Sequence, residues 1–316
     1  MVEFLTAPQT DPRPLMALPV KHNVVLVVSL QLACWTLLWG MEQTGGWSAV
    51  ALAAVLSCVL LTNYALMHEG SHDLLVGSAR ANRMLARVAC ALFPTSFTLF
   101  RVAHDAHHCS NKSLLESFDY YRPGDNRLLK ILGWYAILLG PNWLLMPVGS
   151  VLLSIDPRLL QRGVFARMAA TQRLATLYAE PGVRITILGE TLFVIAYWAL
   201  VIQLLGLSAS TLLLAAAVFA FHWSTRQYLT HAYTPCDVID GAHNLSANRA
   251  IATMLLNGHL DLVHHQKPWL PWSELPHHLA ESRPPVDTWA LYRSMWHGPR
   301  AAPADAPTPL PDTRHA

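Results

Sequence analysis

The chain has 316 residues, of which 53% are hydrophobic and only 13% are Asp, Glu, Lys or Arg. Soluble proteins have about 25% charged residues, so this composition excludes an ordinary soluble domain and favours a membrane protein. The formal net charge of +2 provides no footprint for nucleic acid. Five cysteines are scattered without a CxxC pair, which argues against a disulfide framework and against thiolate zinc sites.

Four apolar runs are expected to cross the membrane, because a helical span requires about 20 residues. They cover residues 23–41, 47–67, 185–205 and 211–227. Several arginines follow the second run, whereas the turn after the first run has no Lys or Arg. By the positive-inside rule, the segments that follow the second and fourth runs face the cytoplasm.

Two further apolar runs are interrupted. Residues 84–100 are short and contain an arginine and a proline, which favours a half-buried interfacial helix. Residues 131–155 are long enough to cross but contain Pro141 and Pro147. We expect a re-entrant or interfacial hairpin there, because the arginine-rich segment 156–184 that follows has to remain on the cytoplasmic side.

The expected fold is all-α: a multi-pass membrane protein with about four transmembrane helices, interfacial or re-entrant helices and a cytoplasmic histidine-rich cap. Residues 1–22 are expected to form a flexible leader, and residues 23–298 a single membrane domain. Residues 299–316 contain several prolines among small and charged residues, and are expected to be disordered.

Three clusters of potential metal ligands lie beside these runs. The first has histidines at i and i+4, the second at i, i+3 and i+4, and the third repeats the second spacing with an aspartate in first place. Residues three and four apart share one face of a helix, so each cluster can approach a common ion. One further histidine follows the fourth run. The candidate ligands are His68, His72, His104, His107, His108, His231, Asp261, His264 and His265.

Eight histidines are too many for one tetrahedral zinc ion, and they suit two adjacent transition metals. Imidazole binds Zn, Cu, Fe and Ni, so the type of ligand alone does not select the metal. Ionisable groups at membrane depth are costly and are usually functional. A metal-binding membrane protein without catalysis remains one interpretation of these clusters.

A second interpretation is an intramembrane zinc protease, because His68-Glu69-Gly-Ser-His72 matches the HExxH pattern. In that pattern the two histidines hold zinc and the glutamate is the general base. Gly70 weakens the helix that the pattern requires. A protease would also leave the second and third clusters unexplained.

The three clusters resemble the histidine boxes HxxxH, HxxHH and HxxHH of the membrane fatty acid desaturase superfamily, which includes carotenoid ketolase-like members. The resemblance covers roughly residues 20–285. Pro268-Trp-Leu-Pro271-Trp272-Ser-Glu-Leu-Pro276 is similar to the segment that commonly follows the third box. His231 resembles an additional histidine that several members have between the second and third boxes.

The third cluster departs from this pattern, because Asp261 occupies the place of the first histidine and His259 lies two residues earlier. In a helix, Asp261 would share a face with His264 and His265, whereas His259 would point elsewhere. A carboxylate is an acceptable iron ligand, so we expect Asp261 in or next to the metal site. If the backbone there is not helical, His259 takes that place.

The resemblance implies an oxidoreductase that binds two iron ions, reduces O2 with external electrons and removes hydrogen from an unactivated C–H bond. Loss of a second hydrogen would give a desaturase acting on a fatty acyl or lipid chain. Transfer of an oxygen atom to the carbon that lost its hydrogen would give a hydroxylase or ketolase acting on a fatty acyl chain or carotenoid. The ligands would be the nine candidates above, on the cytoplasmic face of an integral membrane protein.

The groups that orient the imidazoles are expected among nearby polar residues, namely Asp73, Asp105, Asp119, His243 and His259. No flavin, dinucleotide or fused electron-transfer module is apparent, so we expect an external donor of ferredoxin, rubredoxin or cytochrome b5 type with a reductase. The basic residues expected to dock this donor, or to contact membrane lipids, are Arg122, Arg127, Lys130, Arg162 and Arg167.

Overall fold

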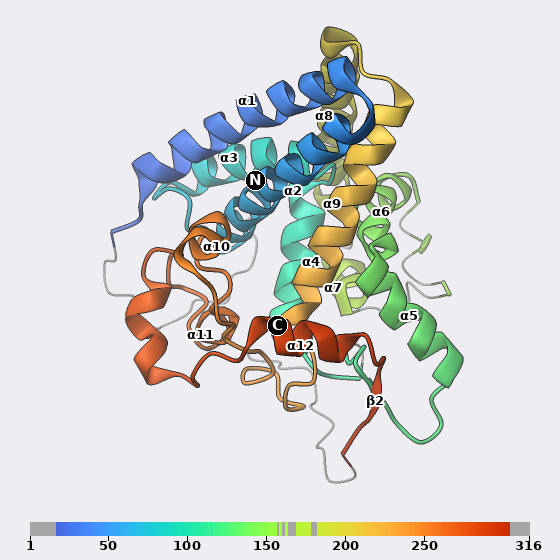
Figure 1. Ribbon diagram of the computed structural model, residues 1–316, viewed down its shortest axis with the longest axis vertical. Helices are drawn as coiled ribbons and strands as arrows, with labels where there is room; N and C mark the ends of the chain where they lie inside the picture. The colour runs from blue at the N-terminus through green and yellow to red at the C-terminus, as the bar shows by residue number, and fades with distance from the viewer. Residues whose placement is uncertain are drawn as a thin grey trace.

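Two helical hairpins form the framework of the molecule (Figure 1). α1 (Val20–Thr44) and α2 (Gly46–Ser71) are joined at Gly45, and α8 (Val183–Leu205) and α9 (Ala209–Leu229) are joined through a turn that begins at Gly206. Both glycines have positive φ, +65° and +63°, a conformation that residues with a Cβ rarely adopt. The computed structural model describes residues 17–303, except 115, 157, 160–161, 164–168 and 178–181.

Three helices of the described chain are long and apolar enough to cross a membrane: α1, α2 and α8, with mean hydropathy of 1.9, 2.0 and 2.0. Only 28% of the apolar window of α1 and of α8 is buried inside the protein, so most of each surface can face lipid. α9 forms a helix where the fourth span is expected, but it does not meet the same criterion of length and hydropathy.

Two bent helix pairs raise the number of candidate spans in the described chain to as many as five. α3 (Ala79–Leu92) and α4 (Phe97–Ser110) meet at 95°. α5 (Arg127–Leu139) meets the continuous segment Pro141–Ile155, made of η1 (Pro141–Leu144) and α6 (Leu145–Ile155), at 88°. The second bend suits the re-entrant hairpin expected over 131–155, although a broken span has the same geometry. The interpretation of 84–100 as one interfacial helix is wrong, because the chain bends sharply inside that segment.

The buried carboxylate of Glu190, on α8, fixes the bend between α3 and α4. It accepts hydrogen bonds from Ser96 Oγ at 2.6 Å, Thr98 N at 2.8 Å and Thr98 Oγ1 at 3.1 Å, all at the start of α4. Arg87 of α3 donates its Nε to the same carboxylate at 2.7 Å. An acidic group at a helix N-terminus satisfies free N–H groups and complements the helix dipole.

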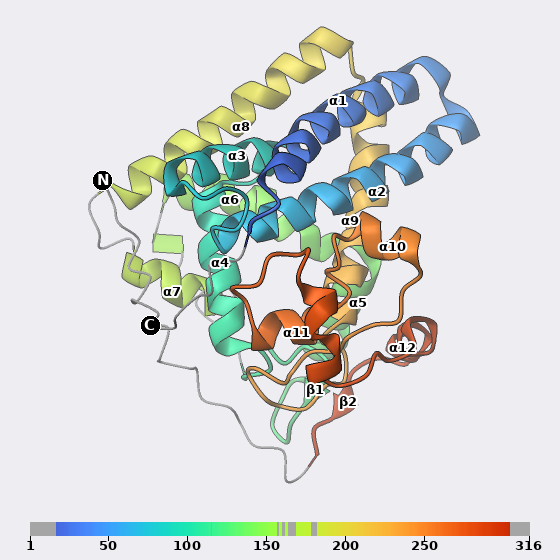
Figure 2. The same ribbon diagram turned by 90° about the vertical axis from the view of Figure 1, so that its left-hand side faces the viewer.

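The remaining short elements gather at one end of the long helices (Figure 2). They include α10 (Arg249–Met254), α11 (Asp261–Gln266), η4 (Leu275–Glu281) and α12 (Thr288–Met295). The strand β1 (Tyr120–Tyr121) pairs in parallel with β2 (Arg300–Ala301), and α7 (Ala169–Leu177) packs against α4. This region includes the third histidine cluster.

The boundaries of the expected leader and tail are displaced. α1 begins at Val20, so the last residues of the expected leader are helical. β2 lies inside the tail expected at 299–316. Residues 1–16 and 304–316 lie outside the described residues, so the flexible leader and disordered tail remain predictions there.

An aromatic core holds α2, α4 and α9 together. Tyr64 of α2 packs against Phe93, Phe100 and Trp223, with ring centroids 5.5–5.8 Å apart. Such aromatic pairs bury large areas and fix the relative orientation of helices. The ends of these three helices therefore have defined positions, and the histidines lie at those ends.

Candidate metal centre

The first histidine cluster lies at the end of α2. His68 is in the last turn of the helix and His72 is the residue that ends it. The helix continues through Gly70. A Cβ at this position would lie 2.7 Å from Ala86 Cβ of α3, which is closer than two such atoms can approach. The glycine therefore permits close packing of α2 on α3, a benefit that the sequence argument on helix propensity did not consider.

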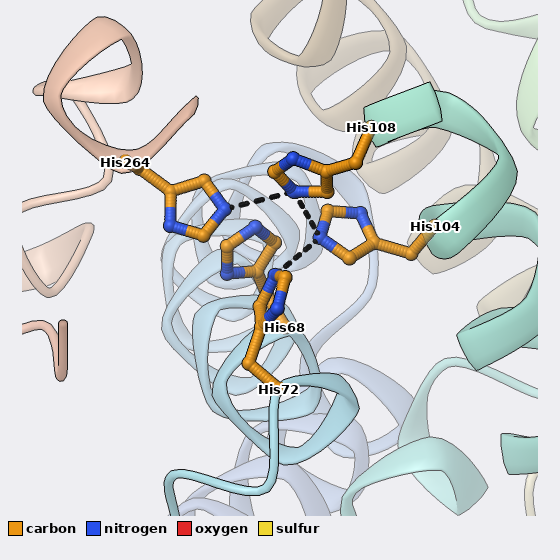
Figure 3. Close-up of side chains that lie close together, drawn as sticks. All are labelled: His68, His72, His104, His108 and His264. Carbon is orange, nitrogen blue, oxygen red and sulfur yellow. Dashed lines mark hydrogen bonds between the residues drawn. The ribbon is translucent and has the colours of Figure 1, made fainter. Parts of the chain in front are cut away.

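Five histidines from three elements converge on one point (Figure 3). His104 Nε2 lies 2.8 Å from His72 Nε2 and 3.0 Å from His108 Nε2, and His264 Nε2 lies 3.0 Å from His108 Nε2. With His68, these residues offer ligand nitrogens that all lie within 4.8 Å of one another. We call His68, His72, His104, His108 and His264 the five-histidine group.

His107, His231 and His265 form a second set whose ligand nitrogens lie within 4.8 Å of one another. We call it the three-histidine group. His107 and His265 are the chain neighbours of His108 and His264. Successive residues of a helix point in different directions, so the two members of each pair enter different groups. The second and third clusters each divide between the two groups in this way, so the groups are adjacent.

Burial keeps the histidines of α11 in the form that a metal requires. Removal from water holds the pKa of both His264 and His265 well below the usual value, and the positive charge of neighbouring histidines acts in the same direction. The imidazoles are therefore neutral, and a neutral ring nitrogen can donate its lone pair to a metal.

Asp261 lies beside the three-histidine group. Its Oδ2 is 3.1 Å from His231 Nε2 and 3.9 Å from His265 Nε2. His259 belongs to neither group, and its buried Nδ1 has no hydrogen-bond partner in the described chain.

The contacts of His231 test whether a metal fits here. Its Nδ1 donates a hydrogen bond to the carbonyl oxygen of Gly241 at 3.1 Å. In the neutral ring, Nε2 then has a lone pair, and it faces a carboxylate oxygen of Asp261 that has no hydrogen-bond donor of its own. The lone pairs of His231 Nε2 and Asp261 Oδ2 repel each other at 3.1 Å unless a cation lies between or beside them. The two residues therefore fit a bound metal ion.

A comparison with protein families decides the classification of this arrangement. The model of the family described as "Fatty acid desaturase" matches residues 45–297, which is most of the chain. The chain belongs to the fatty acid desaturase family. No curated protein matches the chain in a sequence comparison.

Membership of the fatty acid desaturase family implies an oxidoreductase, and the histidine groups fit a di-iron membrane enzyme of this type. The protease interpretation is not supported. Glu69 Oε2 accepts a hydrogen bond from Trp272 N at 3.0 Å, and the residue is only 2% exposed. In this desaturase-family protein Glu69 attaches the segment after the third cluster to α2, and it belongs to neither histidine group.

The acidic residues expected to orient imidazoles have other partners. Asp73 pairs with Arg101 and accepts a hydrogen bond from Asn82. Asp119 pairs with Lys112, and Lys112 Nζ donates to the carbonyl oxygen of His231 at 3.2 Å. Asp119 therefore supports the backbone at His231 and not its ring.

His243 and Asp105, which were also expected to orient imidazoles, lack a contact with a candidate ligand ring within the described residues. His243 donates its Nε2 to the carbonyl oxygen of Ala232 at 3.0 Å. Asp105 is on α4, and no hydrogen bond or ion pair joins it to an imidazole in the described part of the chain.

Glu116 contacts a candidate ligand, and the sequence analysis missed it. Its Oε2 lies 2.7 Å from His107 Nδ1. A carboxylate at this distance holds the proton on Nδ1 and leaves Nε2 free for a metal. The only signal in the sequence is an acidic residue nine positions after His107, and the loop conformation that brings the two together cannot be deduced from that spacing.

A cavity borders both histidine groups, between α2, α9 and the segment before α11. Its empty space, with open solvent included, is about 610 Å³. The wall includes His68, His104 and His264 of the five-histidine group and all members of the three-histidine group. A molecule in this cavity therefore lies directly against the candidate metal centre.

Proposed function

We propose that this protein is an O2-dependent di-iron desaturase that introduces a double bond into a fatty acyl or lipid chain with external electrons. The observation that supports the proposal most strongly is the division of eight buried or partly buried histidines into two adjacent groups beside one cavity. One group alone would suit a structural metal, whereas two adjacent groups suit a reaction that needs two metal ions.

One iron would bind the five-histidine group, and the other would bind the three-histidine group with Asp261. When bound, the two irons supply the reduction of O2 and the oxidising power for removing hydrogen from a C–H bond. Five nitrogen ligands around one ion and a carboxylate beside the other make the two positions chemically different.

The side chains of the protein orient the ligands and exclude water. Glu116 holds the proton on His107 Nδ1, and the Gly241 carbonyl oxygen accepts the proton-bearing Nδ1 of His231. Leu61, Leu255 and Leu256 line the cavity with apolar surface, which suits a hydrocarbon chain. A hydrocarbon chain packed against this surface would displace water and limit side reactions of the oxidant.

The active site is proposed to face the cytoplasm, where a ferredoxin, rubredoxin or cytochrome b5 type donor with a reductase would supply electrons. Among the basic residues proposed for docking, Arg127 is exposed and Arg122 is partly exposed, and both lie in the segment that follows Glu116. Arg167 lies outside the described residues. Membrane lipids are the other expected partners.

Hydroxylation or ketone formation is the second candidate, and Asp261 is the observation that favours it. A carboxylate in place of a histidine changes the charge at the three-histidine group relative to the family pattern. Mass analysis of the product separates the two: desaturation removes two hydrogens, whereas hydroxylation adds one oxygen.

The experiment that tests the proposal is elemental analysis of the detergent-purified protein, on wild type and Asp261→Ala side by side. Two irons per chain in the wild type and loss of iron in Asp261→Ala are expected. One zinc and no iron in the wild type would overturn the proposal. An unchanged iron content in Asp261→Ala would remove Asp261 from the metal site.

A further inference from the structure

Apart from the histidines and the carboxylates of Glu69 and Asp261, the cavity beside the histidine groups has a mainly apolar wall with one basic side chain. Away from the histidines, the wall is formed mainly by Leu61, Tyr64, Ala65, Leu255, Leu256 and Leu275. Arg226 and Gln227, in the last turn of α9, line the same cavity. Neither residue belongs to a histidine group, and the proposed metal chemistry does not use them.

Arg226 is incompletely satisfied. Its Nη2 donates to the carbonyl oxygen of Gly258 at 2.5 Å. Its Nε is buried without a hydrogen-bond partner, and no ion pair joins its guanidinium to a carboxylate within the described residues. The neighbouring Gln227 Oε1 is also buried and unpaired.

These free groups argue against a purely structural role for Arg226. A guanidinium has five N–H donors in a planar fork, and the bond to Gly258 uses only one of them. A buried charged donor without a partner is costly, so its retention in the wall of a cavity points to a ligand that completes it. The complementary ligand is an oxygen acceptor, such as a carbonyl or carboxylate oxygen.

We infer that Arg226 binds a carbonyl or carboxylate oxygen of the lipid substrate and thereby determines which carbon meets the metal centre. This inference rests on the proposed function and deepens it, because it names the residue that positions the substrate. The substrate has its oxygen-bearing group inside the cavity, together with the start of its hydrocarbon chain. A hydrocarbon without oxygen would leave Arg226 unpaired.

The position of Arg226 on α9 limits the distance between that oxygen and the reacting carbon. Arg226 precedes His231 by five residues. α9 ends at Leu229, so His231 lies in the turn just after the helix, and both side chains line the same cavity. The oxidised carbon therefore lies in the half of a long chain nearer its oxygen-bearing end.

The test compares two probes on the iron-loaded full chain in lipid nanodiscs: hexadecanoate and hexadecane, which have the same chain length. Retention of each radiolabelled probe is measured above empty nanodiscs, together with iron content. Arg226→Met removes the charge. Arg226→Gln also removes it but can still donate to Gly258, which keeps the test available if the Met variant does not fold. Arg249→Met is the matched control, because Arg249 is exposed on α10.

Wild type and Arg249→Met are expected to retain hexadecanoate at least about tenfold more tightly than hexadecane, as a charged hydrogen bond requires. In both Arg226 variants this preference should fall toward one, with iron content unchanged. An equal affinity of wild type for both probes, an unchanged preference in the variants, or loss of iron from them would overturn the inference.

Product analysis with a ferredoxin and its reductase separates this inference from the proposed function. Wild type that contains two irons and oxidises hexadecanoate only in the half distant from the carboxylate would refute the inference while supporting a lipid oxidase. Wild type that contains no iron would refute the proposed function, and the retention of the probes would still test Arg226.

Discussion

At the scale of single residues, the contacts that orient the imidazoles distinguish a prepared metal site from a chance cluster. Each histidine has two ring nitrogens, and a partner on one of them determines which nitrogen faces the metal. Glu116 has this role for His107, and the carbonyl oxygen of Gly241 has it for His231. Both partners belong to loops, so their positions depend on the folded structure around them.

Glu116→Ala should weaken iron binding at the three-histidine group, because His107 would lose the acceptor that fixes its ring. Loss of such a partner typically lowers metal affinity or activity by about 10–100-fold. Titration of the metal-free protein with Fe²⁺ would measure the change. Glu116→Gln, which retains an acceptor oxygen, should bind more iron than Glu116→Ala. Glu281→Ala is the control, because Glu281 is exposed near α11. Equal iron affinity in all these variants would remove Glu116 from the site.

His107→Ala and His265→Ala should each abolish lipid oxidation while the protein remains inserted in the membrane. Both residues belong to the three-histidine group, where the loss of one of few ligands cannot be compensated. Product formation and membrane fractionation would be measured on the same samples. Turnover similar to wild type in either variant would contradict the assignment of the metal centre.

At the scale of secondary-structure elements, bends and helix ends place the ligands. α4 begins after a 95° bend and packs against α2, so its histidines meet those of α2, of α11 and of the loop after α9. Glu190 stabilises this bend from α8 through four hydrogen bonds to α3 and α4. A buried carboxylate inside an apolar helix is costly unless it is fully paired, and here each oxygen has donors.

Glu190→Ala should lower the free energy of unfolding by about 1–3 kcal/mol, because the buried donors at the start of α4 would lose their acceptor. Arg87 is 36% exposed and would be hydrated instead. The thermal unfolding midpoint in detergent would show the change. Gln203→Ala, an exposed polar substitution on the same helix, should have little effect. A midpoint for Glu190→Ala equal to that of the control would show that the bend does not depend on this carboxylate.

At the scale of the whole molecule, the candidate metal centre joins parts of the chain that are distant in sequence. The five-histidine group connects α2, α4 and α11, and the three-histidine group connects α4, the loop after α9 and α11. A metal that binds the folded state and not the unfolded chain stabilises the fold by mass action. Iron should therefore stabilise the contacts between the cap and the membrane helices.

Removal of iron by a chelator should lower the thermal unfolding midpoint, and Fe²⁺ should restore it. The neutral imidazoles that converge in each group would lose the metal ion that they share. α11 and the loop after α9 would then separate more readily from α2 and α4. His107→Ala should show a smaller chelator-dependent shift than wild type. If chelation removed all iron and left the midpoint unchanged, the metal would not connect these elements.

The sequence alone determined the features that depend on local spacing. The length of the apolar runs predicted α1, α2 and α8. The spacings of three and four residues placed the ligands of each cluster on one helix. They also identified Asp261, and not His259, as the residue on the face of His264 and His265. The fourth span and the single interfacial helix over 84–100 were less reliable, because both depend on packing as well as hydropathy.

Only the tertiary structure decided how the clusters combine. The division of adjacent histidines between two groups, the contact of Glu116 with His107 and the free Nε of Arg226 all depend on helix crossings and loop conformations. Asp261 and His231 are 30 residues apart in the chain, yet their side chains lie 3.1 Å apart. Local spacing determines which face of a helix a residue occupies, whereas packing determines what that face meets.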